Sequence, residues 1–373
     1  MGGTYRSILK RSFVFLNGLT AVIFLLTCLA PYLDPSRWWF FSILGLGFAF
    51  ILVLLFAFVI FWLFVRPRYM LISLVVLAIG WKSLLSFFGF DLSGTTYDPA
   101  KQKGVLRLAS WNVARFIELK RNNNKGSQTR LKMLDLIKAQ KADVLCLQEF
   151  YHSTDSTFYN NIKYFQEKLG YPYYYFCWDG DGYKQWFGQI IFSRFPIVDS
   201  GKVTYPYPSQ QESLIYADVA YRGDTIRFYT THLQSVQFKK QDFERIEEIK
   251  NREDSILENS KSIFAKLRRA SIYRSRQANI VRETTRQSPH PYVITGDFND
   301  VPNSYTYFTI RGELNDAFLE KGFGIGRTFS GLSPTLRIDY ILPAQDFTVM
   351  QFNRVVRDYS DHYLLVADLK LNK

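Results

Sequence analysis

The chain has few of the residues that bind soft metals, form disulfides or act as covalent nucleophiles. Its 373 residues include three cysteines, and their spacing fits neither a zinc site nor a disulfide framework: Cys28, Cys146 and Cys177. A glycine-rich phosphate-binding loop and a nucleophilic serine or cysteine motif are also absent. These absences argue against a structural zinc protein, a P-loop nucleotide-binding protein and an enzyme that forms a covalent intermediate on serine or cysteine.

Charge is scarce in the first hundred residues, which hold seven Lys/Arg and three Asp/Glu. About 20 apolar residues are needed to cross a bilayer core. Three apolar runs reach that length: Phe13–Leu33, Trp38–Val65 and Met70–Phe90. The sequence therefore predicts a three-span transmembrane region within residues 1–90. The first run could instead be a signal peptide with a cleavage site near Ala30.

Basic residues in short loops predict which way these runs cross the membrane. Those before the first run and between the second and third are Arg6, Lys10, Arg11, Arg66 and Arg68. Only Arg37 lies between the first and second runs. This pattern predicts a multi-pass protein of the inner or plasma membrane whose C-terminal part lies on the non-cytoplasmic side. Basic residues soon after the third run weaken the assignment: Lys101, Lys103 and Arg107.

Residues 105–373 are predicted to form a folded domain after a linker at 91–104, which has no hydrophobic periodicity. Arg130–Ala139 has helical spacing, and two alternating runs flank the turn signal Arg222-Gly223-Asp224 as in a β-hairpin. Strands and helices mix without strict alternation, which indicates an α/β fold with mixed sheets. The chain after residue 100 carries a net charge of +9, which favours phosphorylated or polyanionic partners or an anionic membrane surface.

Acids, amides and imidazoles recur beside the strand-like runs of this domain. They are Asn112, Glu149, His232, Asp297, Asn299, Asp339, Asp361 and His362. Oxygen and nitrogen donors without cysteine suit a hard cation such as Mg²⁺, for which Mn²⁺ can substitute. The pattern therefore predicts a metal-dependent phosphoesterase.

The motifs Trp-Asn-Val, Gln-Glu, Thr-His-Leu, Gly-Asp-Phe-Asn, Arg-Ile-Asp-Tyr-Ile-Leu and Ser-Asp-His occur in this order between Val105 and Leu371. In this respect the chain resembles the endonuclease/exonuclease/phosphatase superfamily, as a membrane-anchored member of bacterial type. That superfamily includes pancreatic deoxyribonuclease, abasic-site endonucleases, neutral sphingomyelinases and inositol-phosphate 5-phosphatases. The resemblance implies a four-layer α/β sandwich, in which two mixed β-sheets are flanked by helices.

The resemblance also implies a role for each motif residue. The metal ligands would be Glu149, Asn112 and Asp361. Asp297 would orient or deprotonate the attacking water. The phosphate would be contacted by Asn112, Asn299, His232 and His362, and Asp339 would hold His362 in one tautomer. One departure is Ala114, where abasic-site endonucleases carry an aspartate, and it argues mildly against the DNA-repair branch.

The sequence thus predicts a membrane-anchored, Mg²⁺-dependent phosphoric ester hydrolase. Its partners would be the bilayer and a phosphodiester or phosphomonoester, of lipid or other membrane-associated origin, and no protein partner is predicted. A membrane-tethered nuclease is the main alternative, supported by the positive charge and by aromatic residues between 176 and 187. A non-catalytic membrane scaffold is a second. The basic segment Lys261–Arg276 is either a solvated helix or a surface for lipid headgroups or nucleic-acid phosphates.

Overall fold

The computed structural model describes residues 2–92, 97–122, 125, 127–180, 183–206, 212–238, 241–242 and 256–372. The chain divides into two compact units, each built from three separate segments. Unit 1 comprises Met1–Phe87, Val236–Arg276 and Val301–Thr309, and unit 2 comprises Phe88–Ser235, Gln277–Asp300 and Ile310–Lys373.

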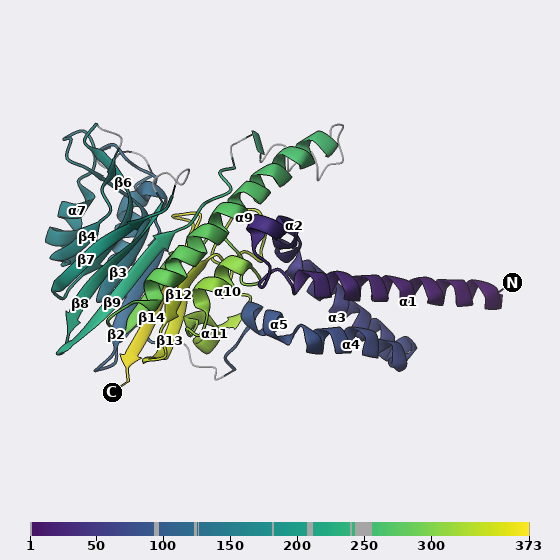
Figure 1. Cartoon of the computed structure of the whole chain (residues 1–373). Coiled ribbons are helices and arrows are strands. Elements are labelled where there is room, and N and C mark those ends of the chain that lie inside the picture. Colours follow the sequence, from purple (N-terminus) through teal and green to yellow (C-terminus); the bar gives the residue numbers. More distant parts are fainter. Residues whose placement is uncertain are drawn as a thin grey trace. The chain divides into compact units, whose positions relative to one another are not determined.

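Apolar helices make up the N-terminal part of unit 1 (Figure 1). They are α1 (Gly2–Thr27), α2 (Pro35–Leu46), α3 (Phe48–Val65), the short 3₁₀ helix η1 (Pro67–Tyr69), α4 (Met70–Ile79) and α5 (Trp81–Phe87). Two continuous helices are long and apolar enough to cross a membrane, namely Ser7–Thr27 of α1 and the whole of α3. The segment from η1 to α5 passes the same test only as a bent pair, with an angle of 71° at the break. The predicted third span is therefore broken, and the predicted number of spans is not confirmed.

The predicted second run, Trp38–Val65, is divided between two helices. Pro35 begins α2 after Asp34, whose side chain accepts a hydrogen bond from the backbone N–H of Ser36. Gly47 ends α2 and precedes α3. Proline at the first helical turn and glycine at a helix end are favourable positions for both residues. The break leaves α3 as the part of this run that can span a bilayer.

Two segments distant in sequence belong to unit 1 as well. The first half of α9 (Ile256–Arg286) contacts α2, since the guanidinium of Arg268 lies 5.1 Å from the ring centroid of Trp39. The segment before α10 (Tyr305–Arg311) contacts the end of α1, where the side-chain amide of Asn303 donates to the carbonyl of Thr27 over 3.0 Å. Parts of the C-terminal chain therefore fold together with the apolar helices.

Unit 2 contains two large mixed sheets. The five-stranded sheet has the order β12 (Asp339–Pro343), β10 (Tyr292–Asp297), β9 (Asp224–His232), β8 (Ser213–Tyr221) and β7 (Ile197–Thr204). The seven-stranded sheet has the order β13 (Phe347–Val355), β14 (Leu364–Leu371), β2 (Leu106–Asn112), β3 (Val144–Ser153), β6 (Gln185–Ser193) and β4 (Tyr173–Phe176), with β5 (Asp179–Gly180) also on β6. A small third sheet pairs β1 (Gly89–Phe90) with β11 (Phe323–Gly324).

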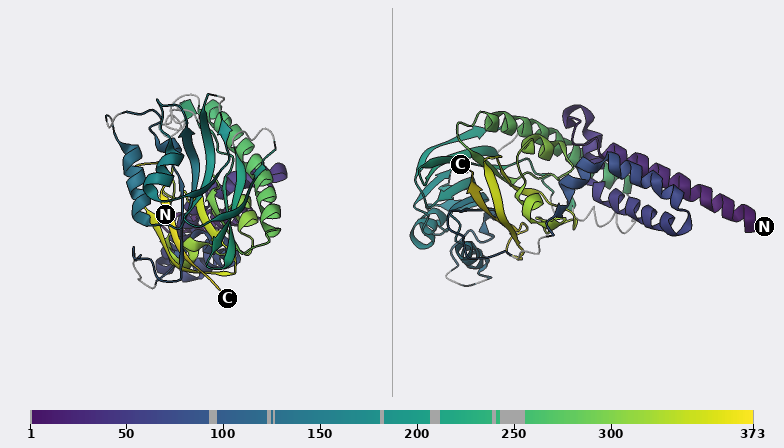
Figure 2. Two further views of the ribbon diagram at one scale, coloured as in Figure 1. Left: turned by 90° about the vertical axis from the view of Figure 1, so that its left-hand side faces the viewer. Right: turned by 90° about the horizontal axis from the view of Figure 1, so that it is seen from below.

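Helices cover the outer faces of the two large sheets. They include α6 (Thr129–Gln140), α7 (Asn161–Tyr164), the π-helical turn η3 (Phe165–Leu169), the second half of α9, and α11 (Ala317–Lys321). In the left view of Figure 2 the sheets lie between the helices of residues 129–169 on one side and α9 on the other. The sheets pack on one another, and the Gln148 amide on β3 donates to Thr230 Oγ1 on β9 over 2.8 Å. The predicted α/β fold with mixed sheets is confirmed.

Several predicted elements are present with small shifts at their ends. The predicted hairpin is β8–β9, and the predicted helix Arg130–Ala139 is α6, which buries Leu134 and Ile137. Strands β4, β7 and β13 were not predicted from the sequence. The basic segment Lys261–Arg276 lies within the helix α9, and residues 239–240 and 243–255 lie outside the described residues.

Part of the predicted linker hydrogen-bonds to the sheets of unit 2. Lys101 Nζ lies 2.6 Å from Asp143, and the guanidinium of Arg107 donates to the carbonyl of Pro99. The same guanidinium makes a two-armed contact with Asp368 at 2.7 and 2.9 Å. Both members of this pair are buried, so removing either would leave an uncompensated buried charge. The described residues from Asp98 to Lys101 are thereby held against β2, β13 and β14.

Candidate active site

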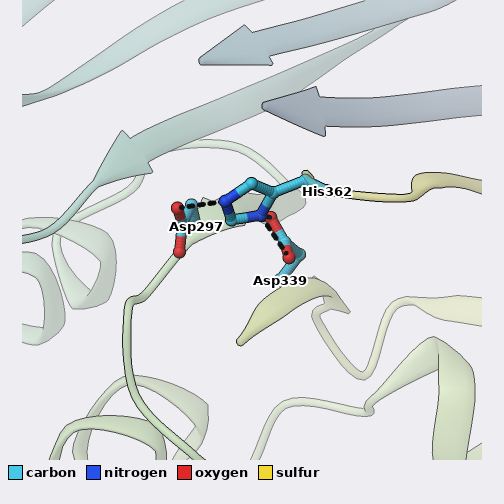
Figure 3. Close-up of side chains that lie close together, drawn as sticks. All are labelled: Asp297, Asp339 and His362. Atoms are coloured by element: carbon cyan, nitrogen blue, oxygen red, sulfur yellow. Dashed lines mark hydrogen bonds and ion pairs between the residues drawn. The ribbon is translucent and has the colours of Figure 1, made fainter. Parts of the chain in front are cut away.

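Asp297, Asp339 and His362 form a buried cluster at one end of the five-stranded sheet (Figure 3). The imidazole of His362 lies between the two carboxylates. Its Nδ1 is 2.9 and 3.0 Å from the two oxygens of Asp339, and its Nε2 is 3.6 Å from Asp297 Oδ2. The predicted pairing of His362 with Asp339 is therefore present in the structure.

Strand register places these side chains together. Asp297 is the last residue of β10, where it is aligned with Asp339 of β12 on one side and with His232 of β9 on the other. The preceding Gly296 has φ of +140°, and a Cβ there would lie 2.0 Å from the carbonyl oxygen of Thr231. Only glycine permits this close approach of β10 to β9. Gly296 therefore positions Asp297 beside His232.

Asn112 and Glu149 come from the seven-stranded sheet and meet Asp297. The Asn112 side-chain amide nitrogen is 3.2 Å from Asp297 Oδ2 and 3.3 Å from Glu149 Oε1. Glu149 follows an apolar run but lies inside its strand, because β3 continues to Ser153. Instead the pairing with β6 shifts between Leu147 and Phe150, and Glu149 has a φ of +49°. Such a bulge re-aims a side chain without ending the strand, which explains how Glu149 reaches the cluster.

His232 completes the polar surface around Asp297. Its Nε2 lies 3.6 Å from Asp297 Oδ2 and 4.0 Å from Glu149 Oε1. The His232 side chain is 14% exposed and that of Glu149 is 35% exposed, whereas Asp297 is almost fully buried. Solvent and a substrate can thus reach the cluster from the side of Glu149 and His232.

Asn299 and Asp361 lie next to this cluster in different ways. The backbone N–H of Asn299 donates to Asp297 Oδ1 over 2.8 Å, and its side-chain amide donates to the carbonyl of Leu233 over 2.9 Å. Asp361 is exposed, and its carboxylate accepts a hydrogen bond from the hydroxyl of Ser360. The adjacent His362 is buried. The predicted roles of Asn299 and Asp361 stay predictions.

The charges in the cluster shift the pKa values of His362 and Asp339. Burial lowers the pKa of His362, but the nearby carboxylates of Asp339 and Asp297 outweigh burial and raise this pKa to about 10. Burial has the opposite effect on Asp339: it raises the pKa of this carboxyl group, and the negative charge of Asp297 raises that pKa further. The contact between Asp339 and His362 Nδ1 favours a proton on that nitrogen. Asp339 would thereby orient the ring so that Nε2 faces Asp297.

The donor groups here suit a divalent cation. One carboxylate oxygen from each aspartate and one nitrogen of His362 lie within 4.8 Å of one another. Because Nδ1 of His362 is already engaged by Asp339, this pair fits a role in orientation better than joint metal ligation. The half-exposed carboxylate of Glu149 offers oxygen donors beside the cluster, and oxygen donors are what hard cations prefer. The amide nitrogen of Asn112 faces the carboxylates, and its side-chain oxygen accepts from the backbone N–H of Ala114.

Three residues support the site although sequence reasoning assigned them no role. The indole N–H of Trp111 donates to the His362 carbonyl over 2.8 Å, and the Ser360 hydroxyl donates to the Asn112 carbonyl over 2.9 Å. Thr328 Oγ1 accepts from the backbone N–H of Asp339. Trp111 and Ser360 lie inside two of the motifs, and this position could have indicated their supporting role. No sequence pattern marks Thr328, because it approaches Asp339 only through the tertiary fold.

Two histidines lie outside the motifs, namely His152 and His290. His290 lies in the loop before β10, whereas His152 is a buried residue of β3. Its ring stacks on Trp186 at 5.6 Å and meets Trp178 edge-on. Burial lowers the pKa of His152 to about 4. Apolar packing therefore explains this histidine without a catalytic role.

Comparison with known families agrees with this geometry. A model of the Endonuclease/Exonuclease/phosphatase family matches residues 109–362, a range that contains every residue of the site. The chain belongs to this family. The three activities that the family description names all act on phosphate esters, so the family fold is that of a phosphoester hydrolase. A second model, a domain of unknown function, matches residues 10–87, and no curated protein sequence matches the chain significantly.

Solved structures show the same fold at low sequence identity. An endonuclease/exonuclease/phosphatase from Beutenbergia cavernae is 20% identical, with a TM-score of 0.52 and 72% coverage of both chains. A family protein from Leptotrichia buccalis is 16% identical, with a TM-score of 0.50, covering 71% of this chain and all of the other. The human Nocturnin catalytic domain, solved with a bound sulfate anion, is 19% identical, with a TM-score of 0.49 and coverage of 73% and 97%. The likeness to the proteins from Beutenbergia cavernae and Leptotrichia buccalis supports the fold and leaves the substrate open.

Proposed function

We propose that the protein is a membrane-anchored, Mg²⁺-dependent phosphoesterase that cleaves a phosphodiester or phosphomonoester of lipid or other membrane-associated origin. In this proposal residues 105–373 are the catalytic domain, 91–104 the linker and 1–90 the anchor. The observation that carries the proposal is the position of Asp297. Its buried carboxylate lies within 3.6 Å of His232, His362 and Asn112, so a base stands among groups that can contact a phosphate.

Each residue has a distinct task in the proposed reaction. Asp297 accepts a proton from the attacking water, and His232 and His362 donate hydrogen bonds to the phosphate oxygens as negative charge develops. Asp339 holds the tautomer of His362, and Asn299 contacts a phosphate oxygen. Glu149, Asn112 and Asp361 would hold the cation, which when bound neutralises phosphate charge and polarises the ester.

The membrane-associated substrate is favoured over nucleic acid because the same chain carries apolar helices long enough to cross a bilayer. A tethered site acts on substrates within a linker's reach of that bilayer. A tethered nuclease is the second candidate. Trp178 and Tyr183 are 47% and 79% exposed and could stack nucleobases, and the guanidinium of Arg115 lies over the ring of Phe187.

The test is a substrate panel with the purified full chain in detergent. The panel holds sphingomyelin, phosphoinositides, plasmid DNA, RNA and bis-p-nitrophenyl phosphate. We expect hydrolysis of a lipid phosphoester and of the chromogenic diester. Cleavage of DNA or RNA without lipid hydrolysis would favour the nuclease. Inactivity on every substrate, with Mg²⁺ and Mn²⁺ both tried, would support the non-catalytic scaffold.

Chelation should abolish this activity, and added Mg²⁺ or Mn²⁺ should restore it, because the carboxylate oxygens of Glu149 suit hard cations. Glu149→Gln removes the charge of the main proposed ligand. We therefore expect its half-maximal Mg²⁺ concentration to rise by roughly tenfold, within the range seen when metal-site residues are altered. Glu167→Gln is the matched control, because Glu167 is an exposed surface residue paired with Lys163. Full activity in EDTA would refute the metal requirement.

Contacts within unit 1 support a third crossing. The α4–α5 segment starts beside the end of α3, where the rings of Trp62 and Tyr69 are 5.0 Å apart. It finishes beside the start of α3, where the rings of Phe48 and Phe87 are 5.5 Å apart. The bent pair thus runs back along the length of α3. With three crossings, the chain after Phe87 would lie on the opposite side from the N-terminus, and basic residues place the N-terminus in the cytoplasm.

Reporter fusions in a bacterial host should therefore place the C-terminus outside the cytoplasm. Alkaline phosphatase fused after Lys373 is expected to be active and a fluorescent protein at the same point to be dark. Fusions after Arg68, in the loop between α3 and α4, are the matched control and should give the reverse readout. A cytoplasmic readout from both fusion points would mean two crossings, and the proposed side of the membrane would be wrong.

A further inference from the structure

The first half of α9 presents an exposed basic face. Lys261–Arg276 contains six basic residues and no acidic residue. Two of the six are internal, since Lys266 Nζ is 2.5 Å from Asp242 and Arg274 is buried. The exposed basic residues are Lys261, Arg268, Arg269 and Arg276. Lys261, Phe264 and Arg268 follow at helical spacing, so they lie on the same face, and the Phe264 side chain is 48% exposed.

This face belongs to the same compact unit as the apolar helices and contacts the segment between them. Arg268 lies over the ring of Trp39, which is on α2. Helix α2 follows α1 and precedes α3, the two helices able to cross a membrane. Its neighbours Trp38 and Phe40 are exposed. Tryptophan at the end of a membrane span is typical of the headgroup level of a bilayer.

We propose that this basic face, defined as Lys261, Phe264, Arg268 and Arg269, binds the headgroups of anionic phospholipids in the bilayer that holds α1 and α3. The inference rests on the membrane anchoring proposed above and adds a lipid-binding surface outside the active site. Basic residues beside an exposed aromatic side chain form the pattern of a helix lying in the membrane interface. Nucleic acid would match the charge, but the contact with Trp39 and the exposed rings of α2 place the face beside the apolar helices.

The test measures hydrogen exchange of residues 256–276 in the full chain, reconstituted into nanodiscs of phosphatidylcholine alone or mixed equally with phosphatidylglycerol. Each basic residue near an anionic surface strengthens association by about fivefold. We therefore expect exchange of this segment to be slower in the anionic discs, on the order of tenfold. The difference should disappear in about 1 M salt, where the screening length falls to about 3 Å.

Two variants locate the effect. K261E/R268E/R269E should exchange at the same rate in both lipids, and K261Q/R268Q/R269Q should show a smaller difference than the natural chain, which guards against misfolding of the reversed variant. K132E/K138E/K141E is the matched control, because it changes the net charge equally at exposed residues of α6 and after it, in unit 2. That control should keep the lipid dependence.

Failure of the inference is distinguishable from failure of the anchoring. A chain that stays in the membrane after carbonate extraction, yet exchanges equally fast in both lipids, overturns the basic face as a lipid site. Equal slowing by both lipids also overturns it, because contact would then be independent of charge. Protection by single-stranded DNA in phosphatidylcholine discs, without protection by phosphatidylglycerol, would assign the face to nucleic acid. Loss of the chain from the membrane on carbonate extraction would instead refute the anchoring.

Discussion

Replacing Asp297 by asparagine is expected to lower turnover by roughly a hundredfold or more, the range of a lost general base. The buried carboxylate accepts hydrogen bonds from the backbone N–H of Asn299 and from the amide of Asn112. Asparagine keeps the size of the side chain and can still accept one of these bonds, but it cannot take a proton from water. The measurement is the initial rate on bis-p-nitrophenyl phosphate at saturating Mg²⁺.

Two controls separate this loss from damage to the fold. Asp135→Asn changes an exposed aspartate on α6 and should leave the rate unchanged. The thermal unfolding temperature of Asp297→Asn should stay within a few degrees of the natural chain, as for a change of about 1 kcal/mol in stability. If Asp297→Asn keeps full activity while folded, the assignment of the water-activating residue is wrong, and much of the proposed mechanism fails with it.

The second large effect is expected at the pair of His362 and Asp339. His362→Ala removes a donor to the phosphate and should cost on the order of a hundredfold or more in kcat. Asp339→Asn leaves a hydrogen-bond partner for Nδ1 but removes the charge that steadies a protonated imidazole. Its loss should therefore resemble that of His362→Ala, in a milder form.

A double mutant distinguishes a functional pair from two independent residues. The carboxylate oxygens of Asp339 lie 2.9 and 3.0 Å from His362 Nδ1, so Asp339 should act through the imidazole. The double mutant should then be little slower than His362→Ala alone, since residues that act as a unit are not additive. Multiplication of the two single-mutant defects would show that Asp339 acts elsewhere. Asp316→Asn would be a poor control, because it breaks the buried pair with Arg337.

Much of the architecture could be predicted because it depends on local patterns. The apolar length of α1 and α3, the alternation in β2, and the turn at Arg222–Asp224 each lie within a short stretch of sequence. The motif residues could also be predicted from the sequence, because carboxylates and amides beside apolar strands are poor core residues.

Other features could not be predicted because they depend on contacts between distant segments. The bend between α4 and α5 depends on packing among the apolar helices. A Cβ at Gly80, for example, would lie 2.5 Å from the ring of Phe24. The short strands β4 and β7 are stabilised by their neighbours in the sheets more than by their own composition.

The sequence by itself determined which chemical groups are available and roughly where along the chain they occur. It supplied four carboxylates and two imidazoles suited to phosphate chemistry, and an apolar region ahead of the segment that carries them. Only the tertiary structure decided which of these groups meet. The register of β9, β10 and β12 sets Asp297 between His232 and Asp339, and the bulge in β3 turns Glu149 toward Asn112. The physical reason is that strand register and bulges are set by pairing between distant segments, such as β2 with β14, where Ser110 lies opposite Leu365, and no local pattern encodes such pairing.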